Sequence, residues 1–278
     1  MARKGILIDV NRCTGCYNCF LACRDEHFGN EYLPLSAAQP LNGQFWMQIK
    51  EIERGEFPRP KLSYIPIPCM QCKDAPCINA ATNGAVYKRD DGIVVIDPVK
   101  AKGQKNIVNA CPYRAIFWNE EEQIAQKCTL CAHRLDEGER RPRCVESCPT
   151  GAMYFGDLDD ETSEISIKAK ELNAGAFHPE YNTDPSVLYA GIPKKFLAGV
   201  VVLADSPGES AQGVKVVLDG NGEKWQILSD SYGDFEFEGL EKNMAYSLTV
   251  EKEGYVSYTT EIFTRTDVNL GEIVISPV

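Results

Sequence analysis

Twelve cysteines, all before residue 149, are the residues of this 278-residue chain whose spacing points to chemistry. Their groups are Cys13-x2-Cys16-x2-Cys19-x3-Cys23, Cys69-x2-Cys72-x4-Cys77, Cys111 alone, and Cys128-x2-Cys131-x12-Cys144-x3-Cys148. Three thiolates at such short spacings hold one cubane 4Fe–4S cluster, while the fourth cysteine of the run ligates the other cluster of a pair. Twelve thiols make three sets of four, so the pattern predicts three clusters and electron transfer.

An internal repeat explains the irregular groups. Residues 8–23 align with residues 96–111, and in the second copy only Cys111 keeps a thiol. A turn begins with Cys-Pro at Cys111 and at Cys148. The same turn recurs at Ala81, where alanine stands in place of the cysteine. A full double set of such repeats would hold four clusters. The four positions that lack the expected thiol are Ala81, Ala101, Gln104 and Ile107.

The exchange of the fourth ligand between paired runs predicts the membership of each cluster. The first set is Cys13, Cys16 and Cys19 with Cys148. The second set is Cys128, Cys131 and Cys144 with Cys23. The third set is Cys69, Cys72 and Cys77 with Cys111. All four positions without a thiol then fall on one site, the mate of the third cluster, and the other three sites stay complete.

Zinc is the alternative metal for part of this pattern. The pairs Cys69-x2-Cys72 and Cys128-x2-Cys131 have the spacing of zinc ligands. The run that begins at Cys13 does not, because compact zinc sites use two well-separated pairs, so iron–sulfur clusters are the favoured prediction. A disulfide framework fits less well, because the chain is long and shows no secretory signal.

The composition is that of an acidic globular protein. Hydrophobic residues make up 44% and charged residues 25% of the chain, as in ordinary soluble domains. The 29 Lys and Arg against 40 Asp and Glu give a net charge of −11, which argues against nucleic acid as a partner. No apolar stretch is long enough to span a bilayer and no signal-peptide pattern precedes Cys13, so we expect a cytoplasmic protein.

No catalytic constellation accompanies the cysteines. The sequence has no phosphate-binding glycine loop, nucleophile elbow or triad, and Gly220-Asn221-Gly222 is a turn signal. The three histidines, His27, His133 and His178, are needed for no ligand set, and we expect packing or surface roles for them. We therefore predict no catalytic residue on this chain and place the chemistry on a partner.

We expect an α+β protein in three parts. Residues 1–160 should form two interlocked bacterial-ferredoxin-like units, one with a degenerate cluster site. Residues 161–195, which contain three prolines, should form a connector or wrapping arm. Residues 196–278 should form an all-β immunoglobulin-like sandwich. The seven expected strands are Ala198–Leu203, Val214–Leu218, Trp225–Leu228, Asp234–Phe237, Tyr246–Glu251, Val256–Phe263 and Val268–Ile275.

The order of the cysteine groups, ending with Lys127-Cys128-Thr129-Leu130-Cys131 and Cys148-Pro149, resembles the iron–sulfur subunits of molybdopterin oxidoreductases. Three clusters followed by a β-sandwich are most similar to the branch that transfers hydroxyl groups between polyhydroxybenzenes. The resemblance implies an electron-transfer subunit in a heterodimer, or a multiple of it. The partner would be a large catalytic subunit that holds a molybdenum bis-pterin (molybdopterin guanine dinucleotide).

The resemblance leaves alternatives open. Related small subunits serve catechol dehydroxylases or aromatic hydroxylases, and a free-standing multi-cluster ferredoxin or a zinc scaffold would be a different class of protein. In four-cluster relatives the path of electrons continues to another acceptor, often in the membrane. Because a gap inside such a path would block transfer, we expect the empty site at its far end and no membrane subunit.

Overall fold

The computed structural model describes residues 2–206 and 211–278. The chain divides into two compact units. Unit 1 comprises Met1–Ile52 and Ser63–Ile192, and unit 2 comprises Glu53–Leu62 and Pro193–Val278. No helix within the described ranges is long and apolar enough to cross a membrane.

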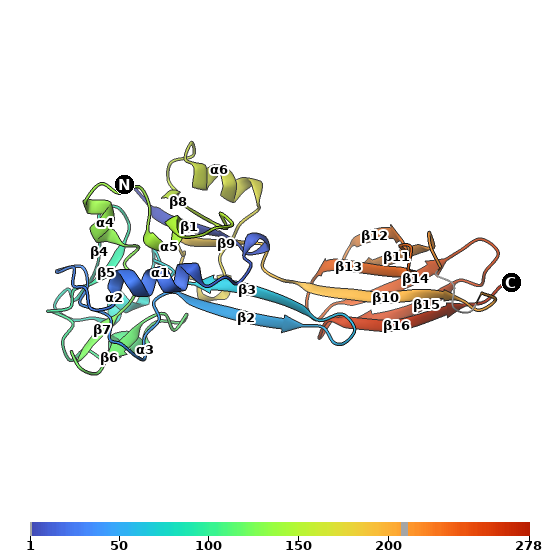
Figure 1. Cartoon of the computed structure of the whole chain (residues 1–278), viewed down its shortest axis with the longest axis horizontal. Coiled ribbons are helices and arrows are strands. Elements are labelled where there is room, and N and C mark those ends of the chain that lie inside the picture. The colour runs from blue at the N-terminus through green and yellow to red at the C-terminus, as the bar shows by residue number, and fades with distance from the viewer. Residues whose placement is uncertain (1, 207–210) are drawn as a thin grey trace. The chain divides into compact units, whose positions relative to one another are not determined.

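Unit 1 combines short helices with small sheets (Figure 1). Its strands are β1 (Lys4–Asp9), β2 (Gln48–Arg54), β3 (Lys61–Ile67), β4 (Val86–Lys88), β5 (Val94–Ile96), β6 (Phe117–Asn119), β7 (Ile124–Gln126), β8 (Met153–Asp157) and β9 (Val187–Ala190), with the far ends of β2 and β3 belonging to unit 2. Its helices are α1 (Asn18–His27), α2 (Pro76–Ala80), α3 (Asn106–Asn109), α4 (Ala132–Asp136), α5 (Arg143–Glu146) and α6 (Glu164–Glu171), with 3-10 turns η1 (Val10–Arg12) and η2 (Pro179–Tyr181).

The helices that follow the cysteine loops pack in two pairs. Helix α1 packs against α5, and α2 packs against α3. The antiparallel hairpins β4–β5 and β6–β7 connect the elements of the second pair to the rest of the unit. This doubled arrangement is the ferredoxin-like fold that the internal repeat predicts, and it places each run of cysteines beside the last cysteine of another run.

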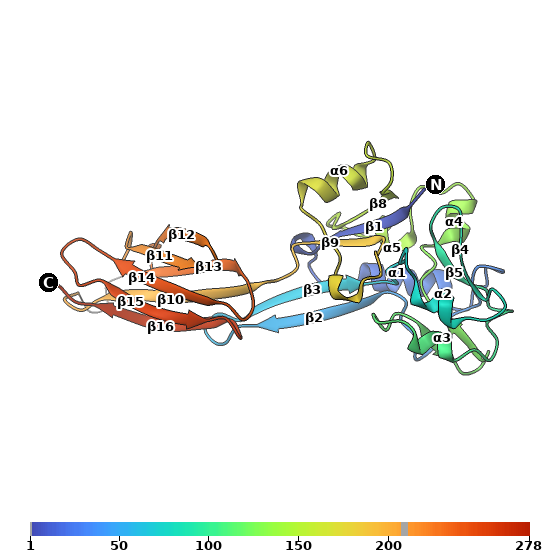
Figure 2. The same cartoon turned by 180° about the vertical axis from the view of Figure 1, so that it is seen from behind.

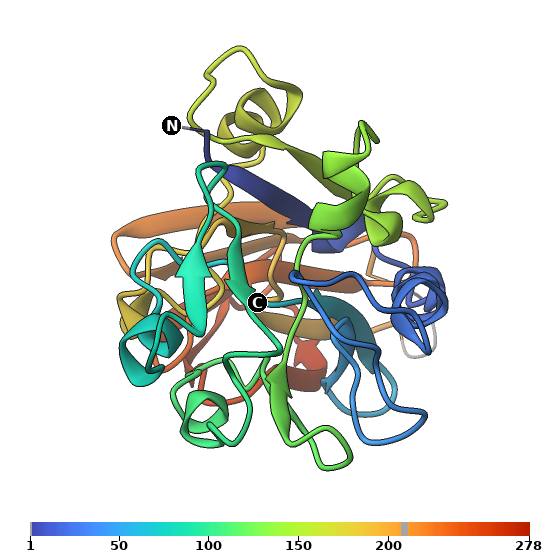
Figure 3. The same ribbon diagram turned by 90° about the vertical axis from the view of Figure 1, so that its left-hand side faces the viewer.

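Strand β1 is the centre of a three-stranded sheet in the order β8–β1–β9 (Figure 2). Ile6 and Ile8 face the main core, whereas Leu7 lies in a second cluster with Ile165 of α6. Side chains alternate along a strand, so β1 is buried on both faces. Figure 3 shows α6, in yellow-green, beside the dark-blue β1.

The structure corrects the expectation that residues 161–195 form a connector or wrapping arm. The segment contains α6 and also β9, which pairs in parallel with β1 from Ile6–Val187 to Asp9–Ala190. Burial of Val187 and Tyr189 in the main core makes the segment part of unit 1. The three prolines suggested an extended arm, but they do not interrupt α6 or β9.

From residue 195 on, the described part of unit 2 contains seven strands. They are β10 (Lys195–Leu203), β11 (Lys215–Gly220), β12 (Glu223–Leu228), β13 (Asp234–Leu240), β14 (Ala245–Glu251), β15 (Tyr258–Phe263) and β16 (Val268–Ile275). Two sheets, β13–β10–β16 and β12–β11–β14–β15, share one core. Each of the seven expected runs overlaps one of these strands. The sequence Ser206-Pro207-Gly208 also predicts a turn, which lies partly outside the described residues.

Unit 2 also includes residues 53–62, which the sequence pattern did not predict. Lys61 pairs with Glu236 and Glu238 of β13, and Arg59 lies 2.6 Å from the Asp234 carboxylate. These ion pairs fix the tip of the β2–β3 hairpin against the edge of a sheet. A charge pattern spread over such distant residues gives no local signal in the sequence.

Candidate metal centres

Three cysteine loops share one backbone conformation. The residue before the second cysteine of each Cys-x2-Cys pair has a positive φ: 67° at Gly15, 49° at Gln71 and 51° at Leu130. This left-handed turn is uncommon for residues other than glycine. In the third loop it directs the backbone N–H of Leu130 to Cys128 Sγ, at 3.4 Å. The loops therefore present amide hydrogens to sulfur, as cluster-binding loops do.

The turns after Cys111 and Cys148 repeat a second conformation. The third residue after each cysteine, Arg114 or Gly151, has a φ of 54° or 60°. The backbone N–H of Ala115 then donates to Cys111 Sγ at 3.4 Å, and that of Ala152 to Cys148 Sγ at 3.3 Å. Both turns bring an amide donor to the sulfur of the single cysteine that the exchange rule assigns to a distant run.

The first group of thiols gathers at the start of α1. Burial raises the pKa of Cys19 to about 12. The neighbouring thiols that add to this rise are Cys13, Cys148 and Cys16. Cys16 is the exposed member of the twelve, whereas Cys19 is buried. The structure thus brings residue 148 to the N-terminal run, and the group lies near the surface on one side.

The second group is the most deeply buried. Burial raises the pKa values of Cys23 and Cys144 well above the ordinary thiol value, and burial raises the pKa of Cys131 to about 12. Cys128 and Cys131 are the thiols that add most to the rise at Cys23. Cys131, Cys128 and Cys23 are in turn the thiols that add most to the rise at Cys144, so both ends of this run lie near the thiol supplied by α1.

The third group joins the loop at residue 69 to α2 and to Cys111. Burial raises the pKa of Cys72 to about 12 and that of Cys77 to about 11. The other thiols that raise the pKa of Cys72 are Cys69, Cys111 and Cys77. The Thr183 hydroxyl, 2.8 Å from the Tyr113 hydroxyl, partly offsets the rise at Cys72.

The three groups follow one another in space. Cys19 of the first group contributes to the raised pKa values of Cys23 and Cys144 in the second. Cys69 of the third group is, after burial, the largest cause of the raised pKa of Cys128, which is about 11. The second group therefore lies between the first and the third. That each group holds a cluster remains a prediction.

The vacant site, defined by Ala81, Ala101, Gln104 and Ile107, is filled by protein. Ala101 and Ile107 are fully buried in the core of unit 1. Gln104 Oε1 accepts from the Thr82 backbone N–H at 2.8 Å, and its Nε2 donates to the Lys100 carbonyl at 2.8 Å. Glycines keep the left-handed turns of the complete sites, with φ of 79° at Gly103 and 63° at Gly84.

Two of the three histidines, His27 and His133, lie close to the second group. His27 is buried, its ring centre is 4.7 Å from that of Trp46, and its Nε2 is 3.8 Å from Cys131 Sγ. Burial, followed by His133, lowers the pKa of His27 to about 3. His133 Nε2 lies 2.9 Å from Glu26 Oε1. We expected packing or surface roles for the histidines, and the burial of His27 and His133 fits packing.

Lys127 was missed as a functional residue, although it directly precedes a ligand cysteine. Its side chain is buried, and Nζ donates to the carbonyls of Val94 and, at 3.1 Å, Cys128. Burial alone would lower its pKa, but the thiolates of Cys69, Cys77 and Cys128 outweigh burial and raise the pKa. The available signal was a single basic residue in the cysteine-containing run 124–131, which has no other charged residue.

The donor set fits 4Fe–4S clusters. All twelve cysteines are free thiols, and most are buried beside other thiols. Thiolates gathered without water are unfavourable, and cluster iron provides the positive charge that makes them stable. Among the described residues no three Cys, His, Asp or Glu side chains converge on a single-ion site. A cubane takes one thiolate at each of four irons, which spreads its ligands more widely.

Comparison with known proteins agrees with this chemistry. Residues 60–158 match the family described as a 4Fe-4S dicluster domain. The pyrogallol hydroxytransferase small subunit of Pelobacter acidigallici is 40% identical over 98% of this chain and 99% of its own length. One subunit of the sulfite dehydrogenase of Allochromatium vinosum is 35% identical over 68% of this chain and 83% of its own. One subunit of the tetrathionate reductase of Salmonella typhimurium is 35% identical over 70% and 75%.

These relatives define a class of protein: iron–sulfur electron-transfer subunits that accompany a larger catalytic subunit in enzyme complexes. The chain belongs to the iron–sulfur small subunits of the molybdopterin oxidoreductase family, in the branch of the Pelobacter pyrogallol hydroxytransferase small subunit. The predicted resemblance is confirmed. The number of clusters, the partner's cofactor and its substrate are matters for proposal.

Proposed function

We propose that this chain carries three 4Fe–4S clusters and conducts electrons for a large molybdenum subunit that transfers hydroxyl groups between polyhydroxybenzenes, as from pyrogallol to phloroglucinol. The ligands are the three sets of four cysteines given above. The complex is a heterodimer or a multiple of it, cytoplasmic, without a membrane subunit. When bound, the clusters supply one-electron transfer, and the residues of this chain hold them, space them and exclude water.

The observation that carries the proposal is the linear order of the three thiol groups. The second group adjoins the first through Cys19 and Cys23, and the third through Cys69 and Cys128. We place the vacant site next to the third group, at the end of the path, because α2 (Pro76–Ala80) carries Cys77, is capped by Ala81 and packs on α3. Electrons can therefore pass along all three clusters without crossing the vacant site.

The surface beside the first group favours docking of the large subunit there. Cys16 is exposed, and α1 and its neighbouring loop expose the apolar side chains of Leu21, Phe28 and Phe45. The Arg24 guanidinium lies 5.4 Å from the Phe28 ring centre and 5.8 Å from that of Phe45. An apolar face with a cation held on its aromatic rings is typical of the core of a protein interface.

Transfer of a hydroxyl group between polyhydroxybenzenes involves no net oxidation or reduction. In such a complex the clusters set or restore the oxidation state of the partner's metal and are not used in every turnover. Unit 2, which we propose to be an immunoglobulin-like sandwich, serves as a docking or packing module. A second candidate substrate class, that of catechol dehydroxylases and aromatic hydroxylases, would leave the role of this chain unchanged.

Anaerobic purification of the native complex tests the proposal. We expect a large molybdenum-containing chain to co-purify, with about 12 irons (three clusters of four) and matching acid-labile sulfide on this subunit. The complex should convert pyrogallol to phloroglucinol in the presence of a polyhydroxybenzene acceptor. A colourless protein with zinc, a free monomer in gel filtration, or a haem-bearing membrane chain in the complex would each contradict a named part of the proposal.

A further inference from the structure

We propose that Lys127 is a fixed cation between the second and third clusters and raises the reduction potentials of both, with the larger effect on the third. The inference rests on the proposed function, because it concerns clusters held by these thiols. Lys127 touches no substrate and ligates no iron. Its role is to favour the reduced state of the two clusters that lie farther from the exposed Cys16.

The position of the ammonium group follows from its two carbonyl partners. Lys127 comes directly after β7, and its Nζ donates to the Val94 carbonyl in β5 and to the Cys128 carbonyl at 3.1 Å. The Cys128 carbonyl belongs to the second group's loop, and Gln71 of the third group's loop donates to the same carbonyl at 2.9 Å; among the thiols, Cys69, Cys77 and Cys128 interact most strongly with the lysine charge. The cation therefore acts on two ligands of the third group and one ligand of the second.

Gln71 forms hydrogen bonds with the same two residues, Val94 and Cys128. Its Nε2 donates to the Cys128 carbonyl at 2.9 Å, and its Oε1 accepts from the Val94 backbone N–H at 2.8 Å. Gln71 is itself fully buried and belongs to the loop between Cys69 and Cys72. One amide side chain therefore links the loops of both groups to β5, and the carbonyls that bind Lys127 Nζ cannot move independently.

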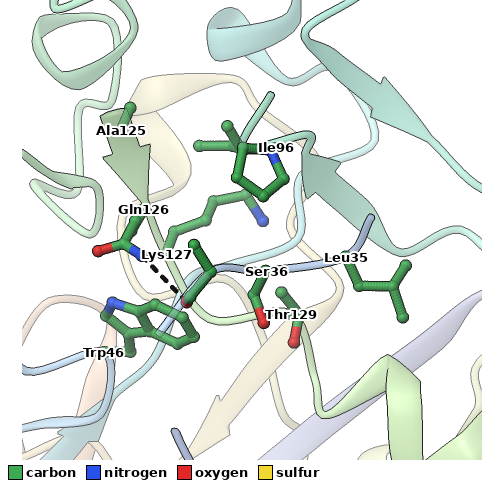
Figure 4. Close-up of a pocket in the computed structure, with 10 residues that line it drawn as sticks. Leu35, Ser36, Trp46, Ile96, Ala125, Gln126, Lys127 and Thr129 are labelled. Atoms are coloured by element: carbon green, nitrogen blue, oxygen red, sulfur yellow. Dashed lines mark hydrogen bonds between the residues drawn. The ribbon is translucent and has the colours of Figure 1, made fainter. Parts of the chain in front are cut away.

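Water has little access to this cation. Lys127 lines a cavity of about 10 Å³ together with Ser36 and Thr129 (Figure 4). The hydroxyls of Ser36 and Thr129 have no hydrogen-bond partner in the described structure, and the volume suits about one water molecule. Charges screened by so little water act strongly on their neighbours, so the field of Lys127 reaches both thiol groups.

The direction of the effect follows from charge. Reduction adds one electron to a cluster that four thiolates already make negative, and net charge is one of the quantities that set cluster potentials. A nearby cation stabilises the reduced form more than the oxidised form. Its removal should therefore lower the potentials of the third and second clusters and leave the first nearly unchanged, because the hydrogen bonds that hold Lys127 connect it to the loops of the second and third groups.

The test is a potentiometric titration of the anaerobic holo-complex, followed by electron paramagnetic resonance, with Lys127→Met. At a fixed potential we expect the reduced-to-oxidised ratio of the third cluster to fall at least tenfold, which for one electron corresponds to 59 mV. The second cluster should change less and the first should not change. Lys127→Arg, which keeps the charge, should retain most of the wild-type potentials. Lys105→Met, at an exposed lysine, is the matched control and should change none.

The outcomes separate this inference from the proposed function. Suppose that the wild-type complex holds three clusters and that their reduction potentials are the same in Lys127→Met. This result would overturn the role of the lysine and leave the proposed function standing. An equal shift of all three clusters would also overturn it, because that result indicates general loosening. If Lys127→Met loses iron, Lys127→Gln, which keeps an N–H donor without charge, gives the same comparison. Wild-type protein without iron would overturn both proposals.

Discussion

The third thiol group and the vacant site come from one pair of repeats, and only the third group has cysteines. Comparing them shows which backbone turns form without thiols and which hydrogen bonds depend on sulfur. The third thiol group has Cys69, Cys72 and Cys77 with Cys111, and the vacant site has Ala101, Gln104 and Ile107 with Ala81. Both have a residue with a positive φ directly before the second ligand position: Gln71 before Cys72 in the third group, and Gly103 before Gln104 in the vacant site. The turn therefore forms in the vacant site without any thiol to support it.

The hydrogen bonds differ where the thiol is missing. In the complete site the Ala115 backbone N–H donates to Cys111 Sγ at 3.4 Å. At the equivalent place in the vacant site the Ala85 N–H donates to the Thr82 carbonyl at 2.9 Å. A buried amide needs a partner, and the chain supplies a carbonyl where sulfur is absent. The vacant site is therefore satisfied and packed without metal, although its backbone keeps the turns of a cluster-binding loop.

The largest expected effect comes from removing the ligands of the complete site. The double variant Cys77→Ala and Cys111→Ala should lower the iron content from about 12 to about 8 atoms per chain, because one set of four ligands is lost and two remain. Iron and sulfide analysis with electron paramagnetic resonance would measure this. Ala81→Cys, the equivalent position of the vacant site, is the control and should add no iron. Unchanged iron in the double variant would show that these thiols bind none.

The opposite change should create a fourth cluster. The variant with cysteine at all four vacant positions, Ala81, Ala101, Gln104 and Ile107, should bind about 16 irons, because Gly103 and Gly84 already provide the left-handed turns of the complete sites. The measurement is iron and sulfide after anaerobic reconstitution. A variant with Ala81→Cys and Gln104→Cys alone has too few thiols and should gain no cluster. Failure of the fourfold variant to gain iron, with its other clusters intact, would mean that packing has closed the site.

A smaller effect is expected where packing replaces a ligand. Ile107 is fully buried in the core of unit 1, so Ile107→Ala should destabilise that unit by about 2–5 kcal/mol, the usual cost of such a cavity. The thermal midpoint of the iron-loaded protein should fall. Val99→Ala, at a side chain that is 73% exposed, should change stability by no more than about 0.5 kcal/mol. Equal effects of the two variants would show that Ile107 does not support the core.

Much of this comparison could be predicted from the sequence, because cluster ligands have short, specific spacings. The vacant positions followed from counting thiols in a repeat, and the strand Val268–Ile275 has the bounds that alternation of side chains predicts. Contacts between segments that are far apart in the chain were harder to predict. The parallel pairing of β9 with β1 joins residues far apart in the chain, and no local pattern specifies such a pairing.

Lys127 shows the same limit for the candidate site. A lysine beside a ligand cysteine is compatible with an exposed loop, and lysines are almost never fully buried unless paired. Its burial depends on the carbonyl of Val94, contributed by a different hairpin, and on Gln71 in another cysteine loop. The spacing of the cysteines predicts the ligand sets from neighbours in the chain, whereas the groups that surround these cysteines come from several loops.

The smallest expected effect is a loss of stability when the hydrogen bonds of Gln104 in the vacant site are removed. Gln104 takes the place of a ligand cysteine, and its amide bonds Thr82 N–H and Lys100 C=O, both at 2.8 Å. Gln104→Ala should lower the stability of unit 1 by about 1 kcal/mol, because Gln104 is only partly buried and water can replace much of each bond. Gln104→Glu keeps the acceptor for Thr82 and loses the donor to Lys100, so it separates the two bonds. Thermal midpoints of the iron-loaded variants measure both changes. A loss as large as that of Ile107→Ala would mean that the hydrogen bonds of Gln104, more than apolar packing, keep the vacant site closed.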